Sequence, residues 1–144
     1  MNVTLRPVEP DDLPVFYDHQ CDEIAAARVG WTPRTREAFD AHWAKIMADP
    51  ACMLRTVLVD GVVAGNVVSW DAEGRRYTGY WLGREFWGNG VGSAAMRAYL
   101  DVETRRPLYA DPIETNAASI ALLRRCGFVA AGRDGPHVVL VKED

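Results

Sequence analysis

Short runs of hydrophobic residues, many of them β-branched or aromatic, recur along the chain between polar segments that contain glycine or proline. Such runs predict β-strands, and Asp60-Gly61 between two of them is typical of a tight hairpin turn. Pro7 ends the first strand, which we expect at a sheet edge. A polar turn around Gly74 is predicted for residues 71–76. The expected strands cover residues 3–7, 52–59, 62–70, 77–82, 108–110, 128–133 and 137–142.

Helical signals occupy four other segments. They combine capping residues, early prolines and hydrophobic residues at helical spacing. The expected helices cover residues 10–17, 32–49, 90–103 and 116–127. Residues 18–31 give no clear signal. The resulting order, βααβββαβαββ, predicts an α/β fold with a mixed sheet rather than a regular doubly wound one.

The composition is that of an ordinary globular protein. The 144 residues are 49% hydrophobic and 25% charged, so we expect residues 1–144 to form a single domain. No apolar run is long enough to span a membrane, and a net charge of −4 without a basic patch argues against nucleic acid as a partner. Scattered cysteines favour reduced thiols in the cytoplasm over a disulfide framework or a metal site: Cys21, Cys52 and Cys126.

Three glycines surround the start of the predicted helix at 90–103, and their spacing indicates an anion-binding loop. Backbone N–H groups at a helix start share one concave surface, and the helix dipole adds to their field. Side chains at Gly88, Gly90 or Gly92 would hinder the approach of a phosphate. The spacing fits neither a P-loop, which needs a following lysine, nor a dinucleotide-binding GxGxxG turn in a βαβ unit. Tight helix–sheet packing is the alternative reason for these glycines.

Two segments resemble the signatures of the GNAT N-acetyltransferase superfamily. Trp87-x-x-Gly90-x-Gly92 is similar to the first, in the form found among ribosomal-protein alanine N-acetyltransferases. The segment from Asn116 through Ser119 to Gly127-Phe128 is similar to the second. Two signatures in the expected order are far more specific than one. The resemblance implies an α/β (α+β) fold with a mixed, mostly antiparallel sheet of about seven strands, helices on both faces, and splayed fourth and fifth strands.

The resemblance also implies a site for acetyl-CoA and no metal. Strand 77–82 is expected to bind the pantetheine arm through its backbone, the glycine loop to bind the diphosphate, and Ser119 to assist the departing thiolate. Arg124 or Arg125 is expected to reach the 3′-phosphate, with Arg125 matching the family's basic position, and a solvated helix end is the alternative reading of both. The residues expected to contact the donor are Tyr80, Trp81, Leu82, Trp87, Gly88, Asn89, Gly90, Val91, Gly92, Ser93, Asn116, Ser119, Leu122 and Arg125.

Two positions depart from the family pattern. Trp87 stands in place of an arginine or glutamine, which removes a cationic donor beside the expected diphosphate. Leu123 stands where many relatives carry a tyrosine that acts as general acid, and leucine has no proton to donate. The mechanism that relies on that tyrosine is therefore closed to this chain.

The acceptor implied by the resemblance is an unidentified primary amine, which must lose a proton before it attacks. The candidate bases are Glu23, Asp71, Glu73, Asp111 and Glu114. Glu114 and Asp111 lead because strand 108–110 ends beside the expected thioester. The expected catalytic residues are Ser119, Asn116 and Glu114. Residues 18–36 are expected to wall the acceptor pocket, and the family analogy allows a homodimer.

Two other classes of function stay open at this point. A CoA-binding sensor that has lost catalysis agrees with the absent tyrosine and the unassigned base. A nucleotide-phosphate binder unrelated to CoA would use the same glycine loop, and ATP or NAD would then raise the melting temperature while CoA would not. The leading hypothesis is an acyl-CoA-dependent N-acyltransferase, most simply an acetyltransferase acting by direct attack in a ternary complex.

Overall fold

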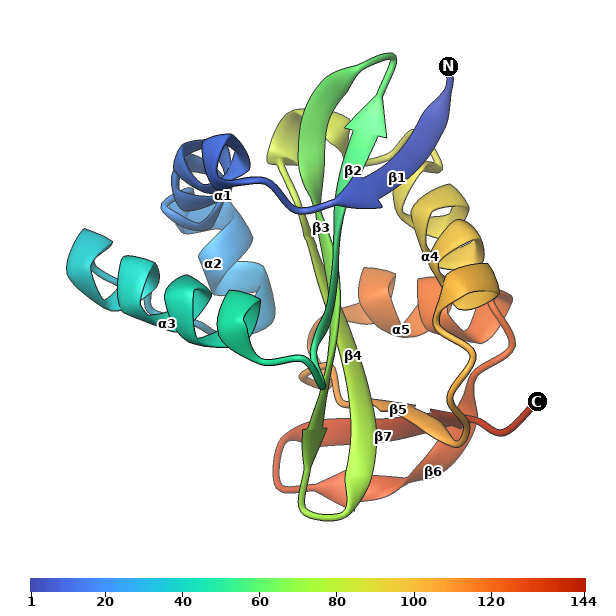
Figure 1. The fold of residues 1–144 in the computed structure, drawn as a ribbon. Coiled ribbons are helices and arrows are strands. Elements are labelled where there is room, and N and C mark those ends of the chain that lie inside the picture. Colours follow the sequence, from blue (N-terminus) through green and yellow to red (C-terminus); the bar gives the residue numbers. More distant parts are fainter.

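A computed structural model describes residues 1–144 (Figure 1). Seven strands and five α-helices, with two short 3₁₀ turns, make up the fold. In chain order they are β1 (Val3–Pro7), η1 (Pro10–Asp12), α1 (Leu13–Gln20), α2 (Glu23–Val29), α3 (Arg36–Ala48), β2 (Met53–Val59), β3 (Val62–Ala72), β4 (Arg75–Leu82), η2 (Arg84–Phe86), α4 (Val91–Val102), β5 (Leu108–Ala110), α5 (Ala117–Arg125), β6 (Val129–Asp134) and β7 (His137–Lys142).

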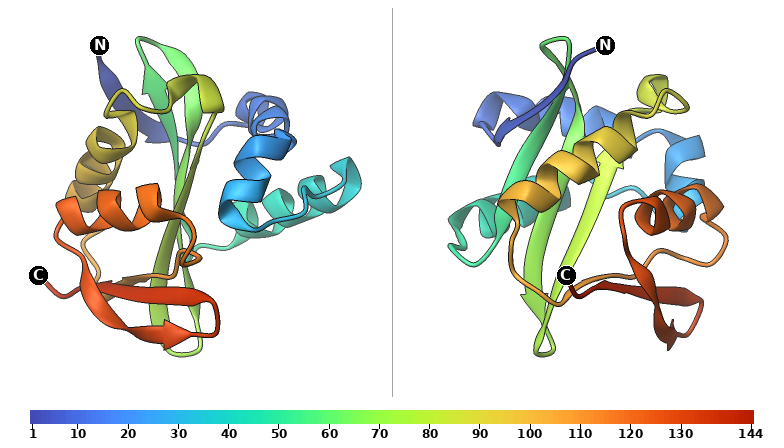
Figure 2. Two further views of the ribbon diagram at one scale, coloured as in Figure 1. Left: turned by 180° about the vertical axis from the view of Figure 1, so that it is seen from behind. Right: turned by 90° about the vertical axis from the view of Figure 1, so that its right-hand side faces the viewer.

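The strands form one sheet in the order β1-β2-β3-β4-β5-β7-β6. Every neighbouring pair is antiparallel except β4 and β5, which are parallel. Helices α1, α2 and α3 lie on one side of the sheet, and α4 and α5 lie on the other (Figures 1 and 2). This confirms the predicted mixed, mostly antiparallel sheet with helices on both faces.

Strands β4 and β5 are paired over only a short stretch. Their register joins Arg76 to Leu108 and Tyr77 to Tyr109, and no later residue of β4 pairs with β5. Beyond Tyr77 the two strands diverge, so the β5-facing edge of β4 is left without a neighbouring strand. The predicted splay of the fourth and fifth strands is therefore confirmed, and it opens a gap through the sheet.

A buried ion pair holds the closed end of this gap together. The Arg76 side chain at the start of β4 donates to Glu103 Oε2 at 2.8 Å, and the Glu103 side chain, at the end of α4, is fully buried. The guanidinium of Arg105 lies 2.9 Å from the other carboxylate oxygen. Burial on its own raises the pKa of Glu103, but hydrogen bonds from Arg105 and Arg76 outweigh it, so the pKa is lowered. The carboxylate is thus kept ionised inside the protein.

Hydrophobic residues pack on both faces of the sheet. A cluster of 16 buried residues joins the sheet to α4 and α5, and it includes Tyr99, Phe128 and Cys126. A smaller cluster of Phe16, Phe39 and Trp43 lies under α1 and α3. Cys126 is buried within the larger cluster. None of the helices combines the length and hydrophobicity that crossing a membrane requires.

The segment predicted as a polar turn, 71–76, is mostly strand. Strand β3 continues to Ala72 and β4 begins at Arg75, so only Glu73 and Gly74 turn the chain, both with positive φ. A two-residue turn with both φ values positive matches the twist of a hairpin. The polar residues misled the prediction because Arg76 is buried by its pairing with Glu103, far away in sequence.

The chain between α1 and α3 also differs from expectation. The segment 18–31, which carried no assignment, contains the short helix α2, capped by the Asp22 carboxylate and ended by Gly30 in a left-handed conformation. Helix α3 begins later than predicted, because Thr35 and not Thr32 is its N-cap, with the Thr35 hydroxyl accepting from the Ala38 N–H.

Candidate active site

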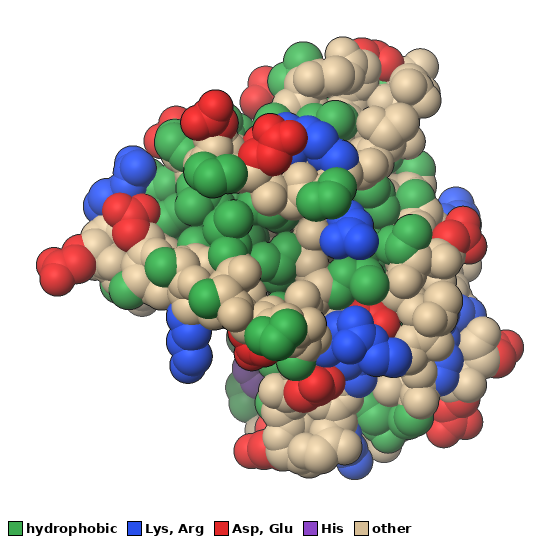
Figure 3. Space-filling model, in the orientation of Figure 1, with side chains coloured by type: hydrophobic (Ala, Val, Ile, Leu, Met, Phe, Trp, Pro, Cys, Tyr) green, Lys and Arg blue, Asp and Glu red, His purple; other side chains and the backbone are tan.

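One cavity of about 1280 Å³ runs through the gap in the sheet. Its walls come from both faces, since it is lined by Phe16 and Trp43 on the α1–α3 side and by Ser93 and Leu122 on the α4–α5 side. Figure 3 shows hydrophobic side chains gathered in the hollow beside α1, α2 and α3. Two ligands entering from opposite faces could therefore meet inside the sheet.

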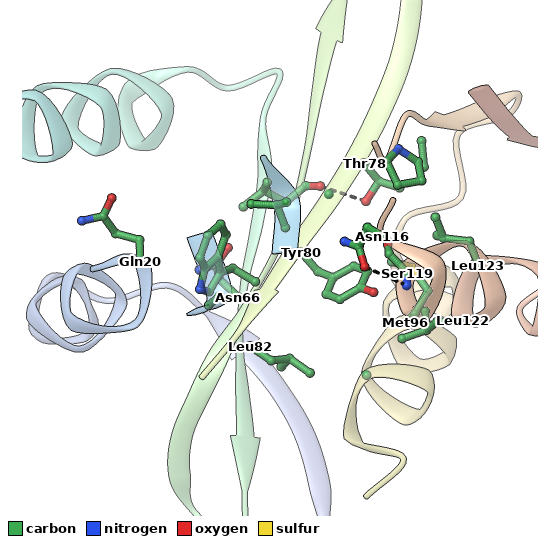
Figure 4. A pocket seen from close by; sticks show the side chains of 18 of the residues that line it. Gln20, Asn66, Thr78, Tyr80, Leu82, Met96, Asn116, Ser119, Leu122 and Leu123 are labelled. Carbon is green, nitrogen blue, oxygen red and sulfur yellow. Dashed lines mark hydrogen bonds between the residues drawn. The ribbon is translucent and has the colours of Figure 1, made fainter. Parts of the chain in front are cut away.

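Side chains of β4 alternate between the two sides of this cavity. Tyr80 lies beside the start of α5, and Leu82, two residues on, packs against the α4–α5 core (Figure 4). Trp81 lies on the other face, where its ring packs against Trp31 in a tilted arrangement with centroids 5.4 Å apart. Alternation along a strand thus gives each half of the cavity its own wall.

The glycine loop is open to this cavity. Gly88 and Gly90 line the cavity with φ values of 80° and 78°, which L-residues other than glycine rarely adopt. No atom lies within 4 Å of the position of an added Cβ at either residue. Gly90 is the N-cap of α4 and no side chain caps the helix, so the backbone N–H groups of its first turn keep capacity for an external acceptor. These features fit a phosphate at the helix start.

The lack of a side chain at Gly92 has a different structural reason. A Cβ there would lie 2.5 Å from Leu122 Cδ1 on α5, so the missing side chain lets α4 and α5 approach each other. The sequence predicted that Gly92 lacks a side chain so that a phosphate can approach. Its surroundings instead support the alternative, that the glycine allows tight packing. Leu122, predicted to contact the donor, lines the cavity and also fills this helix–helix contact.

Two arginines bring positive charge to the loop. Trp87 Nε1 donates to the Leu82 carbonyl at 3.2 Å, so the indole N–H is already used. The Arg28 guanidinium of α2 lies 4.2 Å from the centre of the Trp87 ring, a cation–π contact. Arg125 of α5 donates to the Ser93 hydroxyl at 3.2 Å, and both line the cavity. The cation absent at position 87 is replaced from neighbouring helices.

Asn116, Ser119 and Tyr80 meet at the start of α5 (Figure 4). Asn116 is the N-cap, and its Oδ1 accepts from the Ser119 N–H at 3.3 Å. Burial raises the pKa of the Tyr80 hydroxyl, while a hydrogen bond with Ser119 and the charge of Arg28 act to lower it. Leu123 is turned into the core, with 2% of its surface exposed. The hydroxyl of Tyr80 was not predicted to be functional, because its place beside Ser119 depends on how β4 faces α5.

The acids predicted as bases are placed differently from one another. Glu114 lies outside the cavity lining and forms an exposed ion pair with Arg133 at 2.7 Å. Asp111 lines the cavity, its pKa is raised by partial burial, and its carbonyl lies 2.8 Å from His137 Nδ1. Asp71 also lines the cavity but is bonded to Arg76. Geometry therefore favours Asp111 over Glu114, although they are near in sequence; the remaining candidates, Glu23 and Glu73, lie outside the cavity lining.

The sequence profile of the acetyltransferase (GNAT) domain matches residues 2–129. The chain belongs to the GNAT acetyltransferase family. This confirms the family predicted from the two signatures and makes the chain an N-acetyltransferase by membership, while the ribosomal-protein alanine branch stays a prediction. No curated protein sequence matches the chain significantly.

Solved structures share the fold. An aminoglycoside acetyltransferase, AAC(6')-Ib, in complex with coenzyme A is 21% identical with a TM-score of 0.84, over 99% of this chain and 95% of that one. An acetyltransferase from Thermus thermophilus is 19% identical with a TM-score of 0.86, over 100% and 98%. Spermidine N-acetyltransferase from Vibrio cholerae in complex with CoA and spermine is 18% identical with a TM-score of 0.80, over 96% and 92%. At these identities the likeness shows the fold.

Proposed function

We propose that the protein transfers the acetyl group of acetyl-CoA to a primary amine by direct attack in a ternary complex. The observation that carries the proposal is the single cavity through the splayed sheet, with the glycine loop on one face and a separate aromatic wall on the other. Donor and acceptor would enter from opposite faces and meet beside Tyr80. The CoA complexes of the aminoglycoside and spermidine acetyltransferases, which share the fold, support this assignment.

The donor half of the cavity suits a coenzyme with a diphosphate. The open loop at Gly88 and Gly90 offers backbone N–H groups and the positive end of α4. Arg28 on the Trp87 ring and Arg125 on Ser93 supply cations on either side. The unpaired edge of β4 beyond Tyr77 offers backbone groups to a pantetheine arm, in the manner of an added strand.

Acetyl-CoA, when bound, supplies a thioester carbonyl as the electrophile. The amine nitrogen forms a bond to that carbonyl carbon, and the carbon–sulfur bond breaks. An N–H of the free β4 edge is suited to stabilise the charge that develops on the carbonyl oxygen. Because the amine and the donor share one cavity, no covalent enzyme intermediate is needed.

Two protons move in this reaction, and different residues are suited to each. The Asp111 carboxylate, whose raised pKa makes it a better base than an ordinary aspartate, takes a proton from the incoming ammonium directly or through water. After attack the nitrogen loses its second proton to the Ser119–Tyr80 pair, which in turn gives a proton to the departing thiolate, since both hydroxyls are side by side at the start of α5. Leu123, buried in the core, takes no part.

Thiol release from acetyl-CoA with a panel of amines and peptide N-termini tests the proposal. We expect steady release that depends on the amine and an acetylated product of matching mass. A sensor without catalysis predicts that CoA raises the melting temperature while no amine produces turnover. A binder of other nucleotides predicts that ATP or NAD, and not CoA, raises the melting temperature.

A further inference from the structure

The acceptor half of the cavity carries a wall of unpaired cationic groups. Given the proposed function, these charges indicate the chemistry of the acceptor. Arg34, from the loop before α3, and Lys45, from α3 itself, both line the cavity. Neither forms an ion pair with a carboxylate, whereas the nearby Arg36 is paired with Asp40 at 3.2 Å and lies outside the lining. Two charges are therefore available to a ligand on this wall.

Arg34 is held in place by its backbone. The side chain of Gln20, itself 6% exposed, accepts from the Arg34 N–H at 2.8 Å and donates to the Arg34 carbonyl at 3.1 Å. The Arg34 guanidinium lies 5.2 Å from the centre of the Trp31 ring, which in turn packs against the Trp81 ring. The two Gln20 hydrogen bonds fix the Arg34 backbone, and the contact with Trp31 restrains the Arg34 guanidinium. Arg34 is therefore a positioned group rather than a freely moving surface arginine.

Further hydrogen-bonding groups without partners line the same wall. The Trp81 indole N–H is buried without a partner. Asn66 is 8% exposed, lines the cavity and lies directly across from Trp81 in the β3–β4 register (Figure 4). His42 lines the cavity as well, and burial together with the positive charges of Arg34 and Lys45 lowers its pKa. Buried groups of this kind need a partner.

No acid of the cavity forms an ion pair with Arg34 or Lys45. Asp71 is bonded to Arg76, and the Asp49 carboxylate accepts the backbone N–H of Ala51 at 2.9 Å. Asp111 follows β5, whereas Arg34 and Lys45 come from the loop before α3 and from α3 itself. The cavity thus has an acid at the proposed base and cations on a different element. That polarity matches a molecule with an ammonium at one end and an anion at the other.

We infer that the acceptor is a primary amine that also carries a carboxylate, held by Arg34 and Lys45, as in an amino acid or a short acidic peptide. Asn66 and Trp81 hydrogen-bond the part of the acceptor between its two charges. The inference rests on the proposed acetyl transfer and makes polycationic amines poor acceptors, because their second ammonium would face Arg34 and Lys45.

Matched acceptors test the inference. The panel pairs amino acids and acidic dipeptides with their carboxamides and adds one polyamine and one aminosugar. We expect kcat/KM to be about tenfold higher for each free carboxylate than for its amide, the effect of one hydrogen bond to a charged group. Arg34→Met should abolish this preference, and Arg36→Met, which removes a neighbouring arginine outside the cavity, should leave it unchanged.

A binding measurement separates the failure of this inference from the failure of the proposed function. The melting temperature of the CoA-saturated protein is recorded with N-acetyl amino acids and with their amides. A larger rise with the free carboxylate, lost in Arg34→Met, supports the anion site even if no amine is turned over. Equal rises, or turnover that favours the polyamine or the amides, would overturn the inference while acetyl transfer itself stands.

Discussion

At the scale of single residues, the proposed chemistry depends on which hydroxyl reaches the start of α5. The family resemblance pointed to position 123, where this chain has a leucine instead of a tyrosine, and thus to a missing proton donor. The structure turns Leu123 into the core and brings Tyr80 to Ser119 from the neighbouring strand. A hydroxyl group that is missing from α5 can thus be supplied by β4, which faces the same part of the cavity.

We predict that Ser119→Ala and Tyr80→Phe lower kcat more than they change affinity for CoA. Loss of a positioned proton donor should reduce kcat by about tenfold to a hundredfold, toward the low end of general acid catalysis because a thiolate is a fair leaving group. Steady-state kinetics and calorimetric titration with CoA measure the two effects. Tyr77→Phe, at the closed end of the sheet, is the control, and an equal loss there would remove the special role of Tyr80.

At the scale of elements, the contact between α4 and α5 sets the shape of the donor site. Gly92 and Leu122 let the helices approach, and Arg125 bonds Ser93 across the same contact. The sequence alone does not distinguish the roles of the glycines at positions 88, 90 and 92. Only the structure separates the two left-handed glycines with an open Cβ position from Gly92, where a Cβ would meet Leu122.

We predict that the main effect of Gly92→Val is a lower free energy of unfolding rather than weaker ligand binding. Its Cβ would meet Leu122 at 2.5 Å, and overpacking of this kind costs about 1–3 kcal/mol. Urea unfolding measures the change. Combining the substitution with Leu122→Ala removes the colliding atom, so the double variant should lose less than the sum of the two single losses. Strict additivity of the single losses would show that the helices do not meet there.

Local signals explain which elements could be predicted. The hairpin at Asp60-Gly61 and the cap at Asn116 are encoded within a few residues, and both are present. The turn at 71–76 was wrong because Arg76 is buried through Glu103, a partner that no local pattern reveals. For the same reason the sequence could not rank Asp111 above Glu114, since only the path of the chain after β5 decides which of them faces the cavity.

At the scale of the whole molecule, ion pairs fix the sheet around its gap. At the N-terminus, Asp12 is 2% exposed and its carboxylate accepts hydrogen bonds from Arg6 at 2.7 Å and from the Thr56 hydroxyl at 2.7 Å. Burial acts to raise the pKa of Asp12, but these bonds prevail and lower it to about 2. The pairing ties the segment after β1 to β2 and so holds α1 against the sheet.

The lowered pKa of Asp12 predicts an acid-sensitive share of stability. Because the folded pKa is below the unfolded one, the contribution is complete above about pH 4, amounts to about 2 kcal/mol, and is lost as the pH falls toward 2. Urea unfolding between pH 6 and pH 2, in steps of about one pH unit, should therefore show a steeper decline for wild type than for Asp12→Asn. Asp40→Asn, which breaks an exposed pair, is the control, and equal slopes in wild type and Asp12→Asn would contradict the account.

The central claim is that the open backbone at Gly88 and Gly90 binds the diphosphate of CoA, and calorimetric titration of Gly90→Asn tests it most directly. Asparagine tolerates the left-handed conformation that Gly90 requires and adds a side chain to the open loop. The matched control is Gly61→Asn, since Gly61 has φ 81° and an equally free Cβ position in a distant hairpin. We predict that Gly90→Asn weakens CoA about tenfold or more, leaves acetyl-pantetheine unaffected, and that Gly61→Asn changes neither. Unchanged CoA affinity in a folded Gly90→Asn variant would contradict the account.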